Sequence, residues 1–531
     1  MKKITTLVIA AALLFSLAVT TTAQPTLDPT FSGTGYKLTK VAPARDDIAR
    51  TVLVQENGRI LTGGNSFNSI GYSNIAITRL KPNGAYDNTF GTAGITTITG
   101  GFFCDMALTS NGKIVVAGSG VGPTNVNNYI VYRLKKNGTP DTTFGINGSV
   151  AINIPNSGMI CYDVAVQSDG KIVLGGYQGG SGGYGNMLVV RLKSNGTLDN
   201  TFGTGGMYTL YLTKKHSECH QLLIQPDGKI VAGGYIDTLV MTAFYRYDYA
   251  AIRLNANGTL DNTFGAGGIV RADKGTTDVV YATVQLSDGR IVLGGISNYY
   301  GITQFAALCL TPDGSIDTQF GTDGWKFINF YGGTTFCEAM ATEADDDIVI
   351  AGVAYNTTSS GTKYSIALSK INSLGVLDNA FGEGGIDTSL SSIDYHTAND
   401  VALQSDGKIV IAGYWNVNGG KGSFLTARYA NSPGAAKEFT VSNEKQNLLL
   451  FPNPVSGNSF NVSYHLSGTS NVMLTVYDLN GRIVFTCDFG AMDPGMLNRR
   501  ITLPDQISAG LYIVRLDLDY GVIIDKIQLI R

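Results

Sequence analysis

The sequence has few of the residues that mark the common catalytic and metal-binding chemistries. It contains four histidines and two tryptophans among 531 residues, and 15% of the residues are charged. No Gly-rich phosphate loop, no G-x-S-x-G elbow and no H-E-x-x-H zinc motif occurs in it. A fold can still bring two distant carboxylates together, so these absences argue against an enzyme without excluding one.

Basic clusters and a regular cysteine pattern are lacking as well. The net charge is −3, and no basic run alternates with aromatic residues, which argues against nucleic acid as a partner. The six cysteines are irregularly spaced and predict no disulfide framework. A chain of this length can bury a core without disulfides. We expect no cofactor.

A long apolar run occurs only at the N-terminus. Lys2 and Lys3 precede the apolar segment from Leu7 to Val19, and small residues follow it as far as Ala23. This pattern predicts a signal peptide at residues 1–23. No later stretch of 18 apolar residues occurs, so we expect an exported chain with no transmembrane segment after cleavage.

Glycine (67) and tyrosine (27) are abundant, as in β-rich proteins with many tight turns. The phrase TLDNTFG occurs at 197–203 and 259–265, and near-copies recur about every 58 residues. Each copy has an Asp three residues before its Phe and a Gly four residues after it. The seven phenylalanines are Phe31, Phe90, Phe144, Phe202, Phe264, Phe320 and Phe381.

A second repeated phrase, VQSDGKIVLGG at 166–176, predicts two strands joined by a tight turn, because Asp-Gly and Asn-Gly supply the positive φ of such hairpins. A third strand, such as LVVRL at 188–192, separates the two phrases. Each repeat therefore holds four strands, named A to D. Seven repeats predict an all-β fold, a seven-bladed β-propeller of four-stranded blades over residues 26–430. A β-solenoid is the alternative, although its coils are usually shorter and need capping repeats.

The two ends of the repeat region are complementary. The first phrase, at 27–35, has no C strand before it, and the last C strand has no phrase after it. We expect the N-terminal strand to complete the seventh blade. A cation that precedes the Phe by eleven residues is expected to pair with the Asp and staple the blade, rather than to form a catalytic dyad. The expected pairs are Arg79 with Asp87, Arg133 with Asp141, Arg191 with Asp199, Arg253 with Asp261, and Arg428 with Asp28.

The connections between strands are of two kinds. The A–B and C–D turns are short and alike and share one face of the ring, here called the constant face. The B–C and D–A connections vary and share the other, the variable face, where function usually resides. Their tyrosines suit binding, and packing between blades is the alternative. These rings are Tyr177, Tyr184, Tyr245, Tyr247, Tyr249, Tyr299, Tyr300, Tyr414 and Trp415.

One position near the start of the A strand, ten residues before the Ile of the hairpin, varies between the repeats. A packing role would favour similar residues, so we expect this position, here called the channel column, to line the mouth of the central channel. We predict that it forms the ligand site together with Trp415. The column consists of Arg50, Cys104, Tyr162, His220, Tyr281, Glu338 and Asn399.

The position before the column is apolar or cysteine, so Cys161, Cys219 and Cys337 are expected to pack in the core, with a disulfide between neighbouring blades as the alternative. His216, Cys219 and His220, with Glu218, form a weak zinc candidate, because no second cluster of standard spacing exists. The acidic turn at 345–347 lacks the EF-hand pattern and is expected to be solvated.

The repeat stops before a polar stretch at 431–446, which we predict to be a linker. Residues 447–531 consist of short alternating segments, with an Asn-Gly hairpin at Asn480–Gly481, and predict a small β-sandwich.

Four phrases in this segment, LFPNPVSG, VYDLNGR, AGLYIVRL and KIQLIR, resemble the type A C-terminal sorting domain of the type IX secretion system of Bacteroidota. This resemblance implies export through the periplasm, handling by the type IX machinery, and release or attachment at the cell surface outside the outer membrane. The motif residues are Pro452, Asn453, Pro454, Gly481, Gly510 and Lys526.

The repeats resemble the delta-60 β-propeller family, from whose pattern the sixth hairpin and Cys309 depart. Neither family supplies a catalytic residue. We expect a monomeric, secreted or surface-attached binding module that recognises a carbohydrate or a protein with its variable face. The alternatives are a polysaccharide-active enzyme, with groups such as Glu338 and His220 paired at the channel mouth, and a structural envelope protein.

Overall fold

The computed structural model describes residues 27–430 and 448–530. The gaps within these ranges are 43–44, 70, 122–126, 156, 180–184, 213–214, 242–243, 300, 331–332, 359–360, 383, 389, 393–394, 417–419, 467, 478–482, 505–506 and 519–520. The predicted signal peptide and linker lie outside the described residues. The chain divides into two compact units, Met1–Ala436 and Lys437–Arg531.

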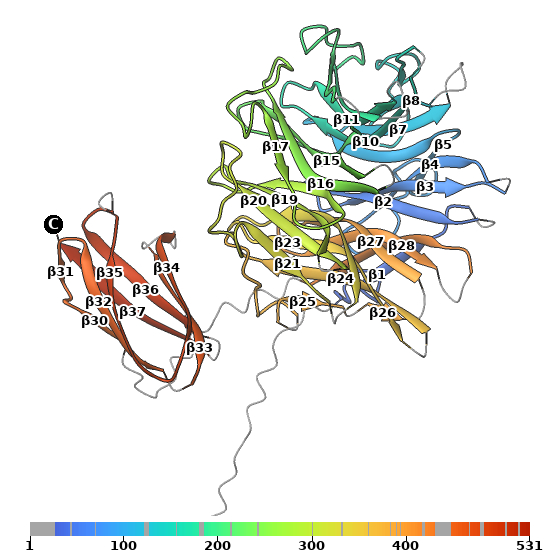
Figure 1. Ribbon diagram of the computed structural model, residues 1–531. Helices are drawn as coiled ribbons and strands as arrows, with labels where there is room; N and C mark the ends of the chain where they lie inside the picture. Colours follow the sequence, from blue (N-terminus) through green and yellow to red (C-terminus); the bar gives the residue numbers. More distant parts are fainter. Residues whose placement is uncertain are drawn as a thin grey trace, which may run out of the picture. The chain divides into compact units, whose positions relative to one another are not determined.

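The first unit forms seven sheets around a ring, which confirms the predicted propeller (Figure 1). Blade 1 contains β2 (Asp47–Val54), β3 (Ile60–Phe67), β4 (Ser73–Leu80) and β5 (Ile95–Ile98). Blade 2 contains β6 (Phe102–Leu108), β7 (Ile114–Val121), β8 (Asn127–Leu134) and β9 (Ser149–Ile152). Blade 3 contains β10 (Met159–Val166), β11 (Ile172–Gly179), β12 (Gly185–Leu192) and β13 (Met207–Thr209).

The remaining blades follow the same order. Blade 4 contains β14 (Ser217–Ile224), β15 (Ile230–Met241), β16 (Phe244–Leu254) and β17 (Ile269–Ala272). Blade 5 contains β18 (Asp278–Gln285), β19 (Ile291–Tyr299), β20 (Ile302–Leu310) and β21 (Trp325–Ile328). Blade 6 contains β22 (Thr334–Thr342), β23 (Ile348–Thr358), β24 (Gly361–Ile371) and β25 (Ile386–Asp387), with β26 (Ser391–Ser392) beside β24.

Blade 7 is built from both ends of the propeller sequence. It contains β27 (Tyr395–Leu403), β28 (Ile409–Asn416), β29 (Ser423–Tyr429) and, as its outer strand, β1 (Tyr36–Thr39). The backbone N–H of Asp28 also donates to the carbonyl of Arg428 at 2.8 Å, and the N–H of Arg428 donates to that of Gly35 at 2.8 Å. The predicted closure by the N-terminal strand is therefore confirmed.

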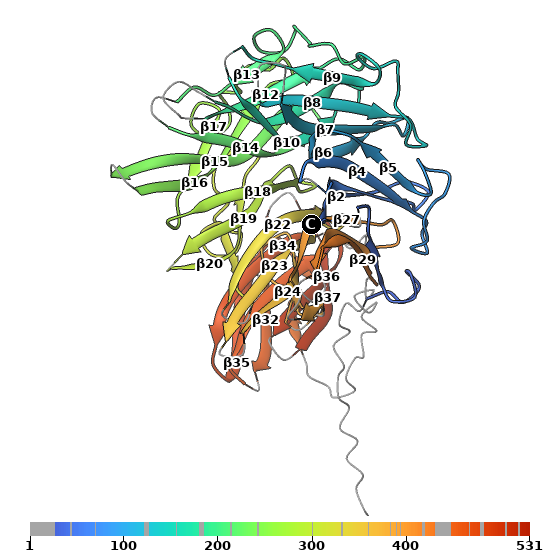
Figure 2. The ribbon, with the colours of Figure 1, turned by 90° about the vertical axis from the view of Figure 1, so that its right-hand side faces the viewer.

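The A strands surround the middle of the ring, and the sheets extend outward from them (Figure 2). The apolar core lies between neighbouring blades rather than in the centre. Val173 and Val189 of blade 3, for example, pack in one cluster with Leu222 and Ile230 of blade 4. Each blade buries both of its faces, so its strands are apolar over most of their length.

The expected Arg–Asp staple links blades as well as turns. In blade 3, the Nε atom of Arg191 lies 2.9 Å from Oδ2 of Asp199. Another nitrogen of the same guanidinium donates to the carbonyl of Ala256, in the C–D turn of blade 4, at 2.5 Å. The guanidinium also lies 4.5 Å from the ring centroid of Phe202. Equivalent staples are formed by Arg79, Arg133, Arg253 and Arg428.

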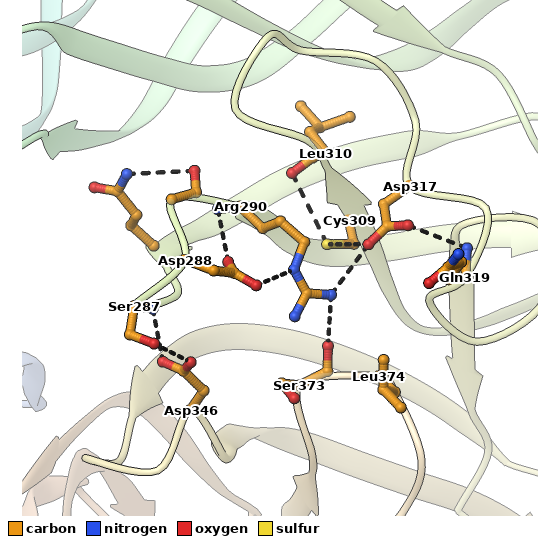
Figure 3. A network of polar contacts seen from close by, with 12 residues as sticks. Ser287, Asp288, Arg290, Cys309, Leu310, Asp317, Gln319, Asp346, Ser373 and Leu374 are labelled. Carbon is orange, nitrogen blue, oxygen red and sulfur yellow. Dashed lines mark hydrogen bonds and ion pairs between the residues drawn. The ribbon is translucent and has the colours of Figure 1, made fainter. Parts of the chain in front are cut away.

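Blade 5 forms the staple with a different residue (Figure 3). Cys309 occupies the arginine position, and Arg290 reaches the same place from the A–B hairpin. Its guanidinium lies 3.0 Å from Oδ2 of Asp317 and donates to the carbonyl of Ser373 in blade 6 at 2.9 Å. Both partner positions match those of the other staples.

Blade 6 has a lysine at the arginine position. The amine of Lys370 lies 2.6 Å from Glu343 and 3.1 Å from Asp347, but 3.8 Å from Asp378 of its own phrase. The acidic turn at 345–347 is thus not solely solvated, because Asp347 pairs with this lysine. A metal ion would have to displace the amine from this cluster.

The second unit is a two-sheet sandwich, as expected. One sheet contains β30 (Leu449–Phe451), β32 (Ser459–Leu466) and β35 (Gly495–Thr502). The other contains β31 (Val455–Ser456), β33 (Ser470–Tyr477), β34 (Ile483–Met492), β36 (Gly510–Leu518) and β37 (Gly521–Ile530). The two sheets enclose a core that includes Phe460, Leu474 and Val514.

Asn453 connects two of the sorting-motif phrases. Its side chain donates to the carbonyl of Lys526 at 2.8 Å and accepts from the N–H of Gln528 at 2.9 Å. Gly510 begins β36 and pairs with Leu529 of β37. Gly481 lies outside the described residues.

The closing staple can be tested against an ordinary one. Arg428 and Arg191 are both buried, and each contacts the Asp of its phrase, a turn carbonyl of the next blade and a Phe ring, so we expect Arg428→Ala and Arg191→Ala each to lower the free energy of unfolding by about 3–5 kcal/mol. Only Arg428→Ala should speed amide hydrogen exchange in β1, because only that staple holds the N-terminal strand. Unchanged protection of β1 in Arg428→Ala would contradict this role.

The substitute staple of blade 5 gives a second comparison. Arg290→Ala should destabilise the propeller by about 2 kcal/mol, since it removes charge-assisted hydrogen bonds to two blades. Lys171→Ala, at the equivalent hairpin position of blade 3, should cost below about 1 kcal/mol, because the Lys171 amine pairs with the half-exposed Asp169. Urea unfolding measures both losses of stability. Equal losses in the two variants would contradict the proposal that Arg290 replaces the missing arginine of blade 5.

Candidate functional site

Each residue of the channel column is the extra residue of a β-bulge. In blade 3 the pairing register shifts between Cys161 and Asp163, so Tyr162 has no partner in β11. The same shift occurs at the column position of the other six blades. A bulge redirects a side chain and relieves it of sheet packing. All seven column residues keep some exposure, whereas the residues that precede them are buried.

A repeated glycine makes room for this bulge. A Cβ atom on Gly176 would lie 2.0 Å from the carbonyl oxygen of Ile160, and one on Gly234 would lie 1.9 Å from that of Glu218. The last glycine of the hairpin phrase has this role in all seven blades. The glycines are Gly64, Gly118, Gly176, Gly234, Gly295, Gly352 and Gly413. They are the sequence signal from which the bulges could be predicted.

Three column residues from consecutive blades form an aromatic cluster. The ring centroids of Tyr162 and His220 are 4.6 Å apart, and those of His220 and Tyr281 are 5.1 Å apart. Each ring is half-buried, so part of each surface is available to a ligand. Blades 3, 4 and 5 thus contribute one continuous aromatic surface.

Glu218 lies behind this surface between two histidines. Its Oε1 atom is 2.7 Å from Nε2 of His216, and its Oε2 atom is 3.0 Å from Nε2 of His220. Nδ1 of His216 accepts the N–H of Gly185 at 2.9 Å, which leaves Nε2 facing Glu218 as the donor. Burial alone would raise the pKa of Glu218, but the two histidine hydrogen bonds lower it to about 2. Glu218 is therefore ionised at neutral pH.

Two more tyrosines surround His216. Its ring lies 5.5 Å from that of Tyr177 and 5.8 Å from that of Tyr235, with Tyr235 stacked. Tyr247 contacts Tyr235 edge-on at 4.7 Å. Burial, with the charge of Glu218, raises the pKa of Tyr235 and of Tyr162. The B–C hairpins thus supply a second layer of rings to the cluster.

Three of the other four column residues are polar, and the fourth, Cys104, packs against the core between blades 2 and 3. Burial raises the pKa of Glu338 to about 7, and the charge of Arg50 opposes this shift. Arg50 itself is exposed, and its guanidinium lies 5.9 Å from the ring of Phe102. Asn399 donates to the carbonyl of Ala49 at 2.6 Å, so it ties blade 7 to blade 1.

Several other candidates have contacts of a different kind. Trp415 lies 5.2 Å from Tyr36 of the closing strand and packs against the core between blades 6 and 7. Tyr249 is fully buried and donates to the carbonyl of Ala306 at 2.8 Å. Tyr299 stacks on Phe327 at 5.2 Å. Tyr184, Tyr300 and the side chain of Tyr245 lie outside the described part of the chain.

The zinc candidate is divided by the strand. His216 and His220 both contact Glu218, whereas Cys219 is fully buried in the apolar core between blades 3 and 4. Cys161 and Cys337 are buried in the same manner, and all six cysteines are free thiols. The disulfide between neighbouring blades is therefore not formed.

Three aspartates that follow the column were missed in the sequence. Asp400 accepts the N–H of Val52 in blade 1 at 2.7 Å, and Asp105 accepts that of Val164 in blade 3 at 3.2 Å. Asp163 accepts likewise from blade 4. Burial raises the pKa of Asp400 to about 8. An Asp directly follows the column residue in these three repeats, and this recurrence could have pointed to a shared structural role.

Comparison with known proteins identifies both parts of the chain. Residues 55–90, 109–144, 167–202, 225–264, 286–320 and 404–432 match the family described as "Domain of unknown function (DUF5122) beta-propeller". Residues 449–530 match the family described as "Secretion system C-terminal sorting domain". The matched repeats omit the hairpin of blade 6, where Lys370 and the acidic turn depart from the pattern. Among curated proteins there is no match.

Some solved structures are distantly similar. A protein of unknown function from Dyadobacter fermentans is 13% identical, with 74% of this chain and 99% of that chain covered and a TM-score of 0.33. Sqt1 from Chaetomium thermophilum is 9% identical, with 74% and 98% covered and a TM-score of 0.38. An α-L-arabinanase from Penicillium chrysogenum is 11% identical, with 61% and 91% covered and a TM-score of 0.34. Similarity at this level carries no functional statement.

The described residues include no helix long and apolar enough to cross a membrane. The sorting domain indicates handling by the secretion machinery, with release from the cell or attachment to its surface. The chain therefore carries repeats of the DUF5122 β-propeller family, followed by a secretion-system C-terminal sorting domain.

Proposed function

We propose that this protein is an exported, non-enzymatic binding module that holds a carbohydrate at the variable-face mouth of its channel, outside the outer membrane. The observation that carries the proposal is the aromatic cluster of Tyr162, His220 and Tyr281, assembled from three blades by bulges at one variable position of the repeat. Every other repeated position that we describe is structural, whereas this one varies and remains partly exposed.

The chemistry of the cluster suits a sugar. Sugars offer flat C–H faces, which pack on aromatic rings, and hydroxyl groups, which need well-placed polar partners. The half-buried rings can pack against the C–H faces, and Glu338, His220 and Arg50 can form hydrogen bonds with the hydroxyl groups. A protein ligand is the other outcome, because tyrosine-rich surfaces also bind proteins.

A polysaccharide-active enzyme is the second candidate, and one observation favours it. Glu338 has a pKa of about 7, which suits a general acid or base at neutral pH, and it lies within the electrostatic reach of Arg50. A paired carboxylate at a suitable separation would be required in addition.

Substitution of Tyr281 tests the binding site. We expect Tyr281→Ala to weaken binding of glycans identified on an array about tenfold, because the ring supplies stacking area. Tyr211→Ala is the matched control, since Tyr211 is 73% exposed and contacts Gln178 rather than the cluster. Titration calorimetry measures both, with thermal melting to check folding.

Two results would count against the binding module. Absence of any glycan binding by the parent protein would favour a protein partner or a structural role. Shortened products in the same mixtures, lost in Glu338→Gln, would favour the enzyme.

The pKa of Glu338 predicts how binding depends on pH. Glu338 becomes ionised as the pH rises through about 7, and a carboxylate accepts a stronger hydrogen bond from a hydroxyl than a neutral acid does. Affinity should therefore rise between pH 6 and pH 8, whereas Glu338→Gln should give a flat profile. A parent protein with no pH dependence in this range would exclude contact between Glu338 and the ligand.

A further inference from the structure

A second run of aromatic rings lies on blades 6 and 7. The ring centroids of Tyr355 and Tyr364 are 6.1 Å apart, those of Tyr364 and Tyr395 are 4.8 Å apart, and those of Tyr395 and Tyr414 are 5.7 Å apart. The hydroxyl of Tyr414 lies 3.3 Å from Oδ1 of Asp46 in blade 1. Tyr395 is 46% exposed, and the other three rings are half-buried.

Glu338 lies on the inner strand between the two runs. Tyr281 lies on β18, Glu338 on β22 and Tyr395 on β27, which are consecutive inner strands in contact around the ring. Burial raises the pKa of both tyrosines, and the charge of Glu338 adds to the shift in each case. Glu338 therefore lies on the inner strand between those that carry the two rings.

The charges near the two runs define the kind of ligand. Glu218 is ionised behind the first run, and Asp46 lies at the end of the second. Arg50 is the cation that acts on Glu338. Glu218 and Asp46 would repel an anionic polymer, while Arg50 and Lys40, which binds the carbonyl of Gly422 beside Asp46, would repel a cationic one, so the mixed charge suits an uncharged ligand.

We propose that the ligand is an extended, uncharged oligosaccharide that crosses the channel mouth, with some of its sugar rings on Tyr162 and Tyr281 and others on Tyr364 and Tyr395. Glu338 lies between these subsites and accepts hydroxyl hydrogen bonds from the middle of the chain. The inference rests on the proposed carbohydrate function and adds to it the length and charge of the ligand. A single sugar covers one run only, whereas a chain contacts both.

Affinity as a function of ligand length tests this inference. The probes are one uncharged glucan or mannan series, whichever the array selects, from the monosaccharide to the hexasaccharide. With the full exported chain, affinity should rise at least tenfold from the shortest to the longest member. Tyr395→Ala and Tyr364→Ala should each remove this gain while fragments bind as before. Tyr211→Ala should keep the gain.

The outcomes separate the two proposals. Equal affinity for short and long members would overturn the extended site and leave the carbohydrate function intact. Tighter binding of a uronic-acid series than of the uncharged series would also overturn it. Failure of every series would remove the carbohydrate function itself. Thermal melting shows whether a variant is folded. Agreement between Tyr395→Ala and Tyr364→Ala, both folded, identifies the loss of a subsite rather than a misfolded blade.

Discussion

The contact on which the propeller most depends is the arginine that joins its own blade to the next one. In the ordinary blades one guanidinium pairs with the Asp of its phrase, donates to a turn carbonyl of the following blade and covers a buried Phe. These contacts are made at the constant face, at the edge of each interblade core. Outside blade 6 each staple leads to the next blade, and Arg428 joins blade 7 to blade 1 by reaching both Asp28 and the carbonyl of Pro82. The residues of the repeated phrase TLDNTFG therefore have a structural role, because they hold neighbouring blades together.

The departures from this pattern show that the partner positions matter more than the residue that fills them. Blade 5 delivers a guanidinium from Arg290 instead of position 309, yet it reaches the same carboxylate and the same turn. In blade 6 the next C–D turn would be the one in blade 7, which is replaced by the two chain ends at Tyr429 and Leu27. An arginine there would have no continuous turn to reach. Lys370 is held by acids of its own hairpin instead.

Much of this could be predicted from the sequence because repetition reveals which positions the fold constrains. The period predicted the blades and the unmatched ends predicted the closing strand, whereas the channel column as a ligand site stays a prediction. The pairing of Glu218 with two histidines depends on these residues lying along a strand, in which alternate side chains share one side, so that Glu218 lies with His216 and His220 while Cys219 lies opposite. Trp415 illustrates the opposite limit. Trp415 lies at the end of β28, beside a variable connection, but the closing strand supplies Tyr36 as its packing partner. This contact joins residues almost 380 positions apart.

The bulge explains how a constrained ring can carry an individual site. It removes one residue per blade from the ladder, so that residue can change without altering the core or the pairing of its neighbours. The bulge also leaves a backbone N–H of the A strand available, and in three blades an aspartate of the preceding blade accepts it. Burying those acids costs free energy, as the raised pKa of Asp400 indicates, and the interblade hydrogen bonds offset part of that cost. The glycine that allows the strand to bulge therefore permits both features: a column residue that varies from blade to blade, and the hydrogen bonds that join neighbouring blades.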